Sequence, residues 1–189
     1  SSGALPAGTW VVDHTTTAVR PTAERAARWH ARGLRFVHAP VFMAPANCAE
    51  GTGLMLISGD LAQRERAGPL PSANTGVRST EGVDPALQGA LQAMTGTLLY
   101  LGPQPERAAA FKLFGNLTLL SILGILGDVG RLAAAVGIDM KDAFSLFDHF
   151  NPGQTLPQRA KRISSGQYSP PSFEMAMARK DLRLMMEEA

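Results

Sequence analysis

Residues 105–126 read PERAAAFKLFGNLTLLSILGIL and mark the point where the chain changes from mixed secondary structure to helices alone. A proline in the first turn, followed by a run of alanines, favours the start of a helix here. Residues 117–126 are strongly apolar, which predicts a buried helix. The sequence therefore predicts an α/β part over residues 1–103 and an all-helical part over residues 104–189.

The first part alternates short strands with short helices. Apolar, β-rich runs predict strands at residues 8–13, 34–41, 54–59 and 97–101, and helical patterns cover residues 21–32 and 84–94. This order is that of an α/β layer, while residues 61–83 have the composition of a loop. In the second part, helices are expected over residues 106–136, 141–150, 156–164 and 173–189.

Composition excludes several classes of protein. Of the 189 residues, 45% are apolar and 18% are charged, which is typical of a globular chain, and the net charge of +2 is too small to indicate a nucleic-acid partner. The one cysteine, Cys48, has no His or Cys at ligand spacing, so neither a disulfide nor a metal site is expected. Because residues 117–126 are too short and interrupted to span a bilayer and no signal segment opens the chain, we expect a cytoplasmic protein without a membrane partner.

Lys112 and Asn116 are the candidate catalytic pair. Their spacing of four residues puts an ammonium and a carboxamide on one face of the predicted helix, one turn apart. A lysine beside apolar surface has a lowered pKa and can exchange a proton near neutral pH, and the amide can anchor a substrate hydroxyl. Many such pairs are solvated, so spacing alone leaves a surface pair as the alternative.

The same two residues resemble the Lys-x-x-x-Asn motif of the β-hydroxyacid dehydrogenase family, which includes 3-hydroxyisobutyrate dehydrogenase and tartronate semialdehyde reductase. Residues 11–17, VVDHTTT, resemble the strand and Asp-x-Ser-Thr segment of that family. Residues 36–41, FVHAPV, followed by EGTGL at 50–54, resemble its substrate loop, and RKDL at 179–182 resembles its C-terminal Lys-Asp-Leu helix. The four motifs occur in family order across nearly the whole chain.

This resemblance implies the C-terminal part of a Rossmann-like NAD(P)-binding domain, followed by an all-helical substrate and dimerisation domain. It implies NAD or NADP as cofactor and hydride transfer to or from a small-molecule substrate, a β-hydroxy acid or a related alcohol or aldehyde. Lys112 would be the general acid/base and Asn116 would orient the substrate, while Thr16 and Lys180 would contact the cofactor. A turn-forming hydroxyl remains the alternative for Thr16, and a solvated helix lysine the alternative for Lys180.

Two departures from the family pattern affect these expectations. Phe42, Met43 and Ala44 stand where the family has a Ser-Gly-Gly that binds the substrate, and they supply no side-chain donor. We therefore expect a bulkier or more apolar substrate. The glycine-rich G-x-G-x-x-G motif, which lies N-terminal to these segments in the family, does not occur. The chain is therefore expected to be an interior portion that is inactive by itself.

Three further expectations remain open. An imine reductase on the same scaffold is the enzymatic alternative, although such members usually carry Asp or Tyr where Lys112 stands. A cofactor-binding or scaffold relative without turnover is the non-enzymatic alternative. Finally, residues 117–126 are apolar all round their helix, so a partner subunit is expected to cover them in a homodimer.

Overall fold

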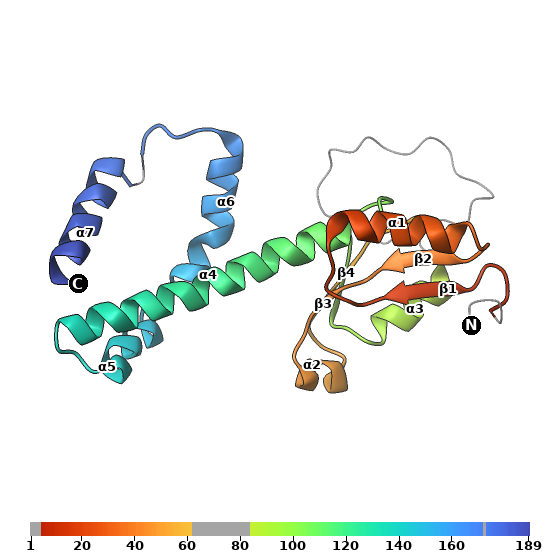
Figure 1. The fold of residues 1–189 in the computed structure, drawn as a ribbon, viewed down its shortest axis with the longest axis horizontal. Coiled ribbons are helices and arrows are strands. Elements are labelled where there is room, and N and C mark those ends of the chain that lie inside the picture. Colours follow the sequence, from red (N-terminus) through yellow and green to blue (C-terminus); the bar gives the residue numbers. More distant parts are fainter. Residues whose placement is uncertain (1–4, 62–83, 172) are drawn as a thin grey trace. The chain divides into compact units, whose positions relative to one another are not determined.

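The computed structural model describes residues 5–61, 84–171 and 173–189. The first elements are β1 (Trp10–Asp13), α1 (Val19–His30), β2 (Arg35–His38), β3 (Val41–Phe42), α2 (Pro45–Glu50), β4 (Leu54–Ile57), α3 (Pro85–Gln92) and β5 (Thr97–Tyr100). Helices then follow: α4 (Arg107–Ala135), α5 (Met140–Ser145), α6 (Leu156–Ser165) and α7 (Met175–Glu188), as Figure 1 shows. The predicted change from α/β to helices is confirmed. The predicted loop at 61–83 lies, apart from Leu61, outside the described residues.

The strands form two small sheets that meet at one bridge. β1 and β2 are parallel, while β4 lies between antiparallel β3 and parallel β5. His38 and Ser58 exchange two backbone hydrogen bonds of 3.0 Å, which join the end of β2 to the end of β4. Helix α1 packs against β2 (Figure 1). The apolar core under the strands contains Val37, Ala39, Met55, Ile57, Leu61, Leu87 and Leu91.

Buried or partly buried polar groups fix where two helices begin. The Asp84 carboxylate accepts hydrogen bonds from the backbone N–H groups of Ala86 at 3.0 Å and Leu87 at 3.4 Å, so it caps α3 as its place in the sequence predicts. At α4 the cap comes from a distant residue. Ser58 Oγ accepts from the Ala108 N–H at 2.9 Å and donates to the Pro105 carbonyl at 2.8 Å. These bonds satisfy backbone groups that a helix start leaves unpaired, and they tie α4 to the end of β4.

One predicted strand is interrupted and one helix was not predicted. The run at residues 34–41 divides into β2 and β3, because Pro40 has no N–H to donate to a sheet. Pro45 opens the short helix α2, which the sequence pattern did not predict. Asn47 stabilises this start, since its Oδ1 accepts a hydrogen bond of 2.8 Å from the Ala44 N–H.

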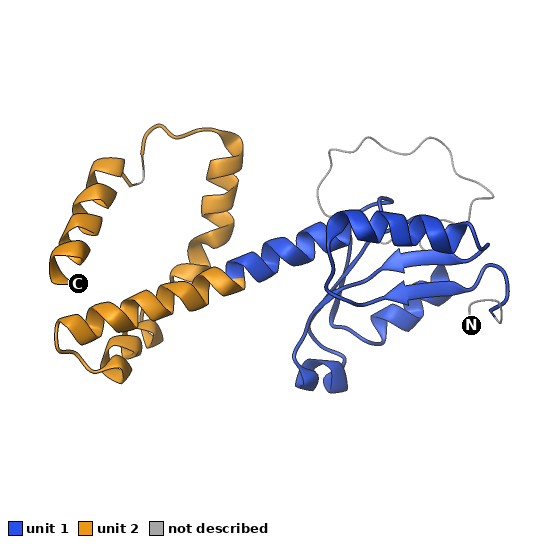
Figure 2. Cartoon of the chain, viewed as in Figure 1, with its two compact units in different colours: residues 1–118 blue, residues 119–189 orange. Residues whose placement is uncertain are grey.

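The chain divides into two compact units, residues 1–118 and 119–189, which Figure 2 shows in different colours. The division falls inside α4 rather than between residues 103 and 104. The first turns of α4, which carry Lys112 and Asn116, therefore belong to the same unit as the strands. The second unit contains the rest of α4 together with α5, α6 and α7.

The apolar part of α4 is exposed, which corrects the prediction of a buried helix. Leu117 is 66% exposed and Leu123 is 64% exposed. Its most apolar 18-residue window has a mean hydropathy of 1.7, so α4 is long and apolar enough to cross a membrane. The apolar run at 117–126 is thus part of a longer apolar helix than the run alone indicated. Length and composition alone do not show whether a membrane or a protein partner covers the apolar surface of α4.

Candidate functional site

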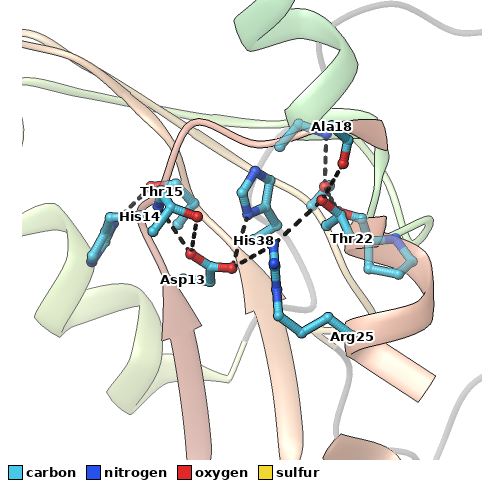
Figure 3. Close-up of polar contacts among 11 residues, drawn as sticks. Asp13, His14, Thr15, Ala18, Thr22, Arg25 and His38 are labelled. Atoms are coloured by element: carbon cyan, nitrogen blue, oxygen red, sulfur yellow. Dashed lines mark hydrogen bonds and ion pairs between the residues drawn. The ribbon is translucent and has the colours of Figure 1, made fainter. Parts of the chain in front are cut away.

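The carboxyl ends of β1 and β2 bring a charged cluster to one edge of the sheet. The parallel register pairs Asp13 with His38, the last residue of each strand. Arg25 reaches the same point from α1, and its Nη2 lies 2.8 Å from Asp13 Oδ2 (Figure 3). In open parallel sheets, ligands bind outside this edge. The cluster thus lies where a nucleotide-binding fold places its ligand.

Asp13 shapes the turn that follows β1. Its Oδ1 accepts hydrogen bonds from the Thr15 N–H at 2.9 Å and from the Thr15 hydroxyl at 2.7 Å. Burial raises the pKa of the Asp13 carboxyl, but the Thr15 hydrogen bonds and the charge of Arg25 outweigh burial and lower that pKa below its usual value. Asp13 is therefore a carboxylate at neutral pH, and it fixes the path of the chain toward Thr16.

His38 is a buried and neutral member of this cluster. Its side chain is fully buried, and neither ring nitrogen has a hydrogen-bond partner among the described residues. The 3.8 Å from Nδ1 to Asp13 Oδ2 is too long for a hydrogen bond. Burial lowers the pKa of His38 to about 4, with Arg25 adding to the effect and Asp13 opposing it. The sequence signal for this pairing is that two neighbouring parallel strands end in Asp13 and His38.

Lys112 lies on the first turns of α4 beneath an aromatic ring. Its Nζ is 3.9 Å from the centroid of the Phe42 ring, which β3 supplies. Burial lowers the pKa of Lys112 below its usual value, and no charged side chain contributes to that shift. Asn116 lies one turn further along the same face and is also half-buried. The structure therefore brings the predicted catalytic residue to the loop that was predicted to bind the substrate.

The other two residues of that loop, Met43 and Ala44, make local contacts. The Met43 side chain lies against Gly53, where an added Cβ would come within 2.8 Å of Met43 Cγ. The Ala44 N–H, a backbone donor that could otherwise meet a substrate, is already bonded to Asn47. The loop thus offers a substrate apolar surface from Phe42 and Met43 rather than hydrogen-bond donors from their side chains.

The two predicted cofactor contacts lie in different units. Thr16 is exposed just beyond β1, and the hydroxyl that bonds Asp13 is that of Thr15 rather than that of Thr16. Lys180 is on α7 in the second unit, where its Nζ lies 2.8 Å from Asp181 Oδ1. This ion pair is the arrangement expected of a solvated helix lysine, and the role of Lys180 at a cofactor stays a prediction.

Thr16, the residue predicted to contact a nicotinamide cofactor, lies at the carboxyl edge of the parallel strands. Thr16 presents an exposed hydroxyl at the carboxyl edge of parallel strands, next to a turn that Asp13 holds in place. A pyrophosphate needs a glycine-rich turn at a helix start, and this sequence has no such motif. The contact of Thr16 with the nicotinamide end of the cofactor stays a prediction. Within the described ranges, no group of three His, Cys, Asp or Glu side chains is arranged to hold a metal ion.

Comparison with known proteins agrees with this arrangement. Residues 2–77 match the sequence profile of the NAD binding domain of 6-phosphogluconate dehydrogenase. A reductive aminase from Aspergillus terreus, solved with NADPH and ethyl levulinate, aligns over 99% of this chain and 60% of its own, with a TM-score of 0.75 and 18% identity. An imine reductase from Streptomyces aurantiacus aligns over 96% and 58%, with a TM-score of 0.70 and 17% identity.

A third solved structure, the imine reductase from Myxococcus stipitatus with NADP⁺, aligns over 96% of this chain and 59% of its own, with a TM-score of 0.70 and 14% identity. This chain thus spans about three fifths of the length of the solved structures that it matches. No curated protein sequence matches it. At these identities the solved structures establish the fold, a Rossmann-like NAD-binding portion followed by a helical domain.

The match over residues 2–77 also confirms the expected cofactor class, NAD or NADP, for the domain that contains the Asp13 edge. Residues 2–77 are thus similar to an NAD-binding domain, and the chain shares its two-domain fold with solved imine reductases and reductive aminases, which supports the predicted likeness to the β-hydroxyacid dehydrogenase family.

Proposed function

We propose that the protein is an NAD(P)-dependent oxidoreductase that moves a hydride between a nicotinamide and a β-hydroxy acid or a related alcohol or aldehyde, with Lys112 as general acid/base. One observation carries this proposal. Lys112 is a half-buried lysine without an ion-pair partner among the described residues, and burial lowers its pKa toward the range where an amine exchanges protons with a substrate.

The chemistry divides between the cofactor and this chain. A bound nicotinamide supplies the hydride acceptor or donor. In the oxidative direction the neutral Lys112 amine takes the proton of the substrate hydroxyl, while the carbon that bears this hydroxyl gives its hydride to the nicotinamide. The products are a carbonyl and a lysine ammonium. In the reductive direction the ammonium returns that proton to the oxygen. Asn116, on the same helix face, orients the hydroxyl through its carboxamide.

Imine reduction is the second candidate activity. The apolar loop favours it, because Phe42 and Met43 offer no side-chain donor for a carboxylate and the Ala44 N–H is already bonded to Asn47. Solved structures that share the fold are described as imine reductases and reductive aminases. Lys112 counts against it, since the resemblance implies Asp or Tyr at that position in imine-reducing members.

A substrate screen of the intact protein tests the two candidates together. We expect nicotinamide absorbance to change with an alcohol, aldehyde or hydroxy acid, and to change little with a cyclic imine under the same conditions. Turnover of imines alone would exclude the hydroxy-acid proposal in favour of the second candidate. Binding of NAD or NADP without turnover of any panel member would favour the scaffold alternative.

We further propose that α4 mediates a homodimer. The support is the exposed apolar surface of this helix, made up of Phe114, Leu117, Leu119, Leu120, Ile122, Leu123 and Ile125. A soluble protein rarely leaves such a surface uncovered, and a second copy of the same helix is a partner of matching apolar character. A cytoplasmic location, without nucleic-acid or membrane partners, stays a prediction from composition.

A further inference from the structure

The ring of Phe42 packs against α4 in the space that is open because Gly115 has no side chain. A Cβ added to Gly115 would come within 2.2 Å of Phe42 Cζ and 2.6 Å of Phe42 Cε1, closer than real atoms approach. Glycine lowers the stability of a helix interior, so its presence in α4 has a local cost that packing must offset. The ring of Phe42 supplies that packing, and the Phe42 side chain also packs against an apolar cluster that includes Leu56 and Leu101.

The ring of Phe42 also covers the charged end of Lys112. Lys112 is three residues before Gly115, so both lie under the ring, and the Lys112 Nζ is 3.9 Å from the ring centroid. A cation at this distance from a ring face is attracted by the negative face of the aromatic ring. Among the described residues no carboxylate pairs with Lys112, and no charged group contributes to the shift of its pKa.

We propose that Phe42 is a positioning residue for Lys112: its ring, seated on Gly115, holds the lysine amine at a fixed place over the ring face. This inference rests on the proposed catalytic role of Lys112 and names the group that orients that lysine. Two opposite effects follow from one ring. Its apolar atoms exclude water from the amine, and its face stabilises the ammonium that remains there.

Two substitutions separate these effects from simple packing. Phe42→Leu keeps apolar cover but removes the ring face, whereas Cys48→Ala, in the adjacent helix α2, leaves the ring in place. We expect the pH midpoint of Lys112 acylation, followed by mass spectrometry of the peptide that contains it, to fall by about 0.4–0.7 pH units in Phe42→Leu. The midpoint in Cys48→Ala should match the wild type. An unchanged midpoint in a folded Phe42→Leu protein would overturn the proposal.

Gly115→Ala tests the same proposal without touching the ring. Alanine favours the helix, and the atom it would strike is the far end of the Phe42 side chain, so the fold should survive while the ring moves off Lys112. We expect the midpoint to rise, because the displaced ring no longer excludes water from the amine and burial is what lowers this pKa. Gly115→Ala added to Phe42→Leu should cause no such rise, since no ring is left to displace. A wild-type midpoint in a folded Gly115→Ala protein, or the same rise in both backgrounds, would contradict the proposal.

Acylation needs no turnover, so this result is separate from the proposed function. A shift of the midpoint in an intact protein whose turnover does not depend on Lys112 would overturn the catalytic role and leave the positioning role. Conversely, a Lys112-dependent turnover with no midpoint shift in any variant would overturn the positioning role alone.

Discussion

His38 shows how burial sets the charge of a single residue near the proposed cofactor edge. The imidazole is fully buried against the Asp13–Arg25 ion pair and lacks a hydrogen bond from the described residues. Asp13 favours the protonated form, whereas burial and Arg25 favour the neutral form and prevail. A neutral ring here fills space beside the turn that leads to Thr16 without adding a second positive charge.

The lowered pKa of His38 predicts acid sensitivity of the fold. The unfolded chain takes up a proton as the pH falls below about 6.5, whereas folded His38 does so only near 4. The contribution of His38 to the free energy of unfolding is thus complete above pH 6.5 and is lost as the pH falls to about 4. Asp13, with a pKa below 3.8, titrates outside this window.

Urea unfolding at pH 7 and pH 5 measures this effect. Between pH 7 and pH 5, the free energy of unfolding should fall by about 2 kcal/mol less in His38→Gln than in the wild type. This difference follows from the distance between the folded and unfolded pKa values of His38. His149→Gln, at an exposed histidine, is the control and should follow the wild type. Equal losses in the wild type and in His38→Gln would show that His38 is not the acid-sensitive group.

At the scale of elements, we propose that the segment from β3 to α2 selects the substrates that approach Lys112. Phe42→Ser, Met43→Gly and Ala44→Gly together restore the hydroxyl and the open backbone of the resembling family. We expect kcat/KM for small β-hydroxy acids to rise, because a carboxylate regains a donor and the loop gains room. Substrates with large apolar groups should be used less well.

A panel of acids of increasing size, assayed by nicotinamide absorbance, checks this prediction. Cys48→Ala is a suitable control, since Cys48 lies in α2, beside the same loop, and leaves the substituted residues intact. If the triple variant keeps its thermal midpoint and kcat/KM for small acids does not rise, the assignment of this loop to the substrate is wrong.

Local signals predicted most elements but few of the contacts between them. Asp84 before Pro85 is a recognisable helix cap, and α3 begins there. Helix α2 was missed because Pro45 marks a strand end and a helix start equally well, and the choice depends on Asn47 folding back to Ala44. The Phe42–Lys112 contact joins residues 70 positions apart and comes from tertiary packing, which periodicity does not encode.

At the scale of the whole molecule, the exposed face of α4 predicts assembly. Leu120 is 65% and Leu123 is 64% exposed, so replacing both with Asp should leave the core of one chain intact while it removes the apolar surface. We expect light scattering at low micromolar concentration to give a dimer mass for the intact wild type and a monomer mass for the double variant.

Ile163→Asp is the matched control, because Ile163 is 66% exposed but lies on α6. It should remain a dimer. A monomer mass for the wild type at these concentrations would contradict the proposed assembly, and a dimer that survives both Asp substitutions would place the interface elsewhere.

The central claim is that Lys112 moves the substrate proton, and replacing it in the intact protein tests this most directly. We expect Lys112→Ala to lower kcat by about 10²-fold or more, the usual contribution of a general acid/base, with cofactor affinity nearly unchanged. Lys112→Arg should be similarly impaired, since a guanidinium keeps its charge but does not release its proton. Lys161→Ala, at an exposed lysine, should retain wild-type turnover.

The pH profile adds a signature that a structural role would not produce. Oxidation needs the neutral amine, so the wild-type rate should rise with pH through the lowered pKa of Lys112, and this limb should be absent from both variants. The account predicts loss of turnover and of the pH limb together in Lys112→Ala. Near-wild-type turnover of a folded Lys112→Ala protein, with the limb intact, would contradict it.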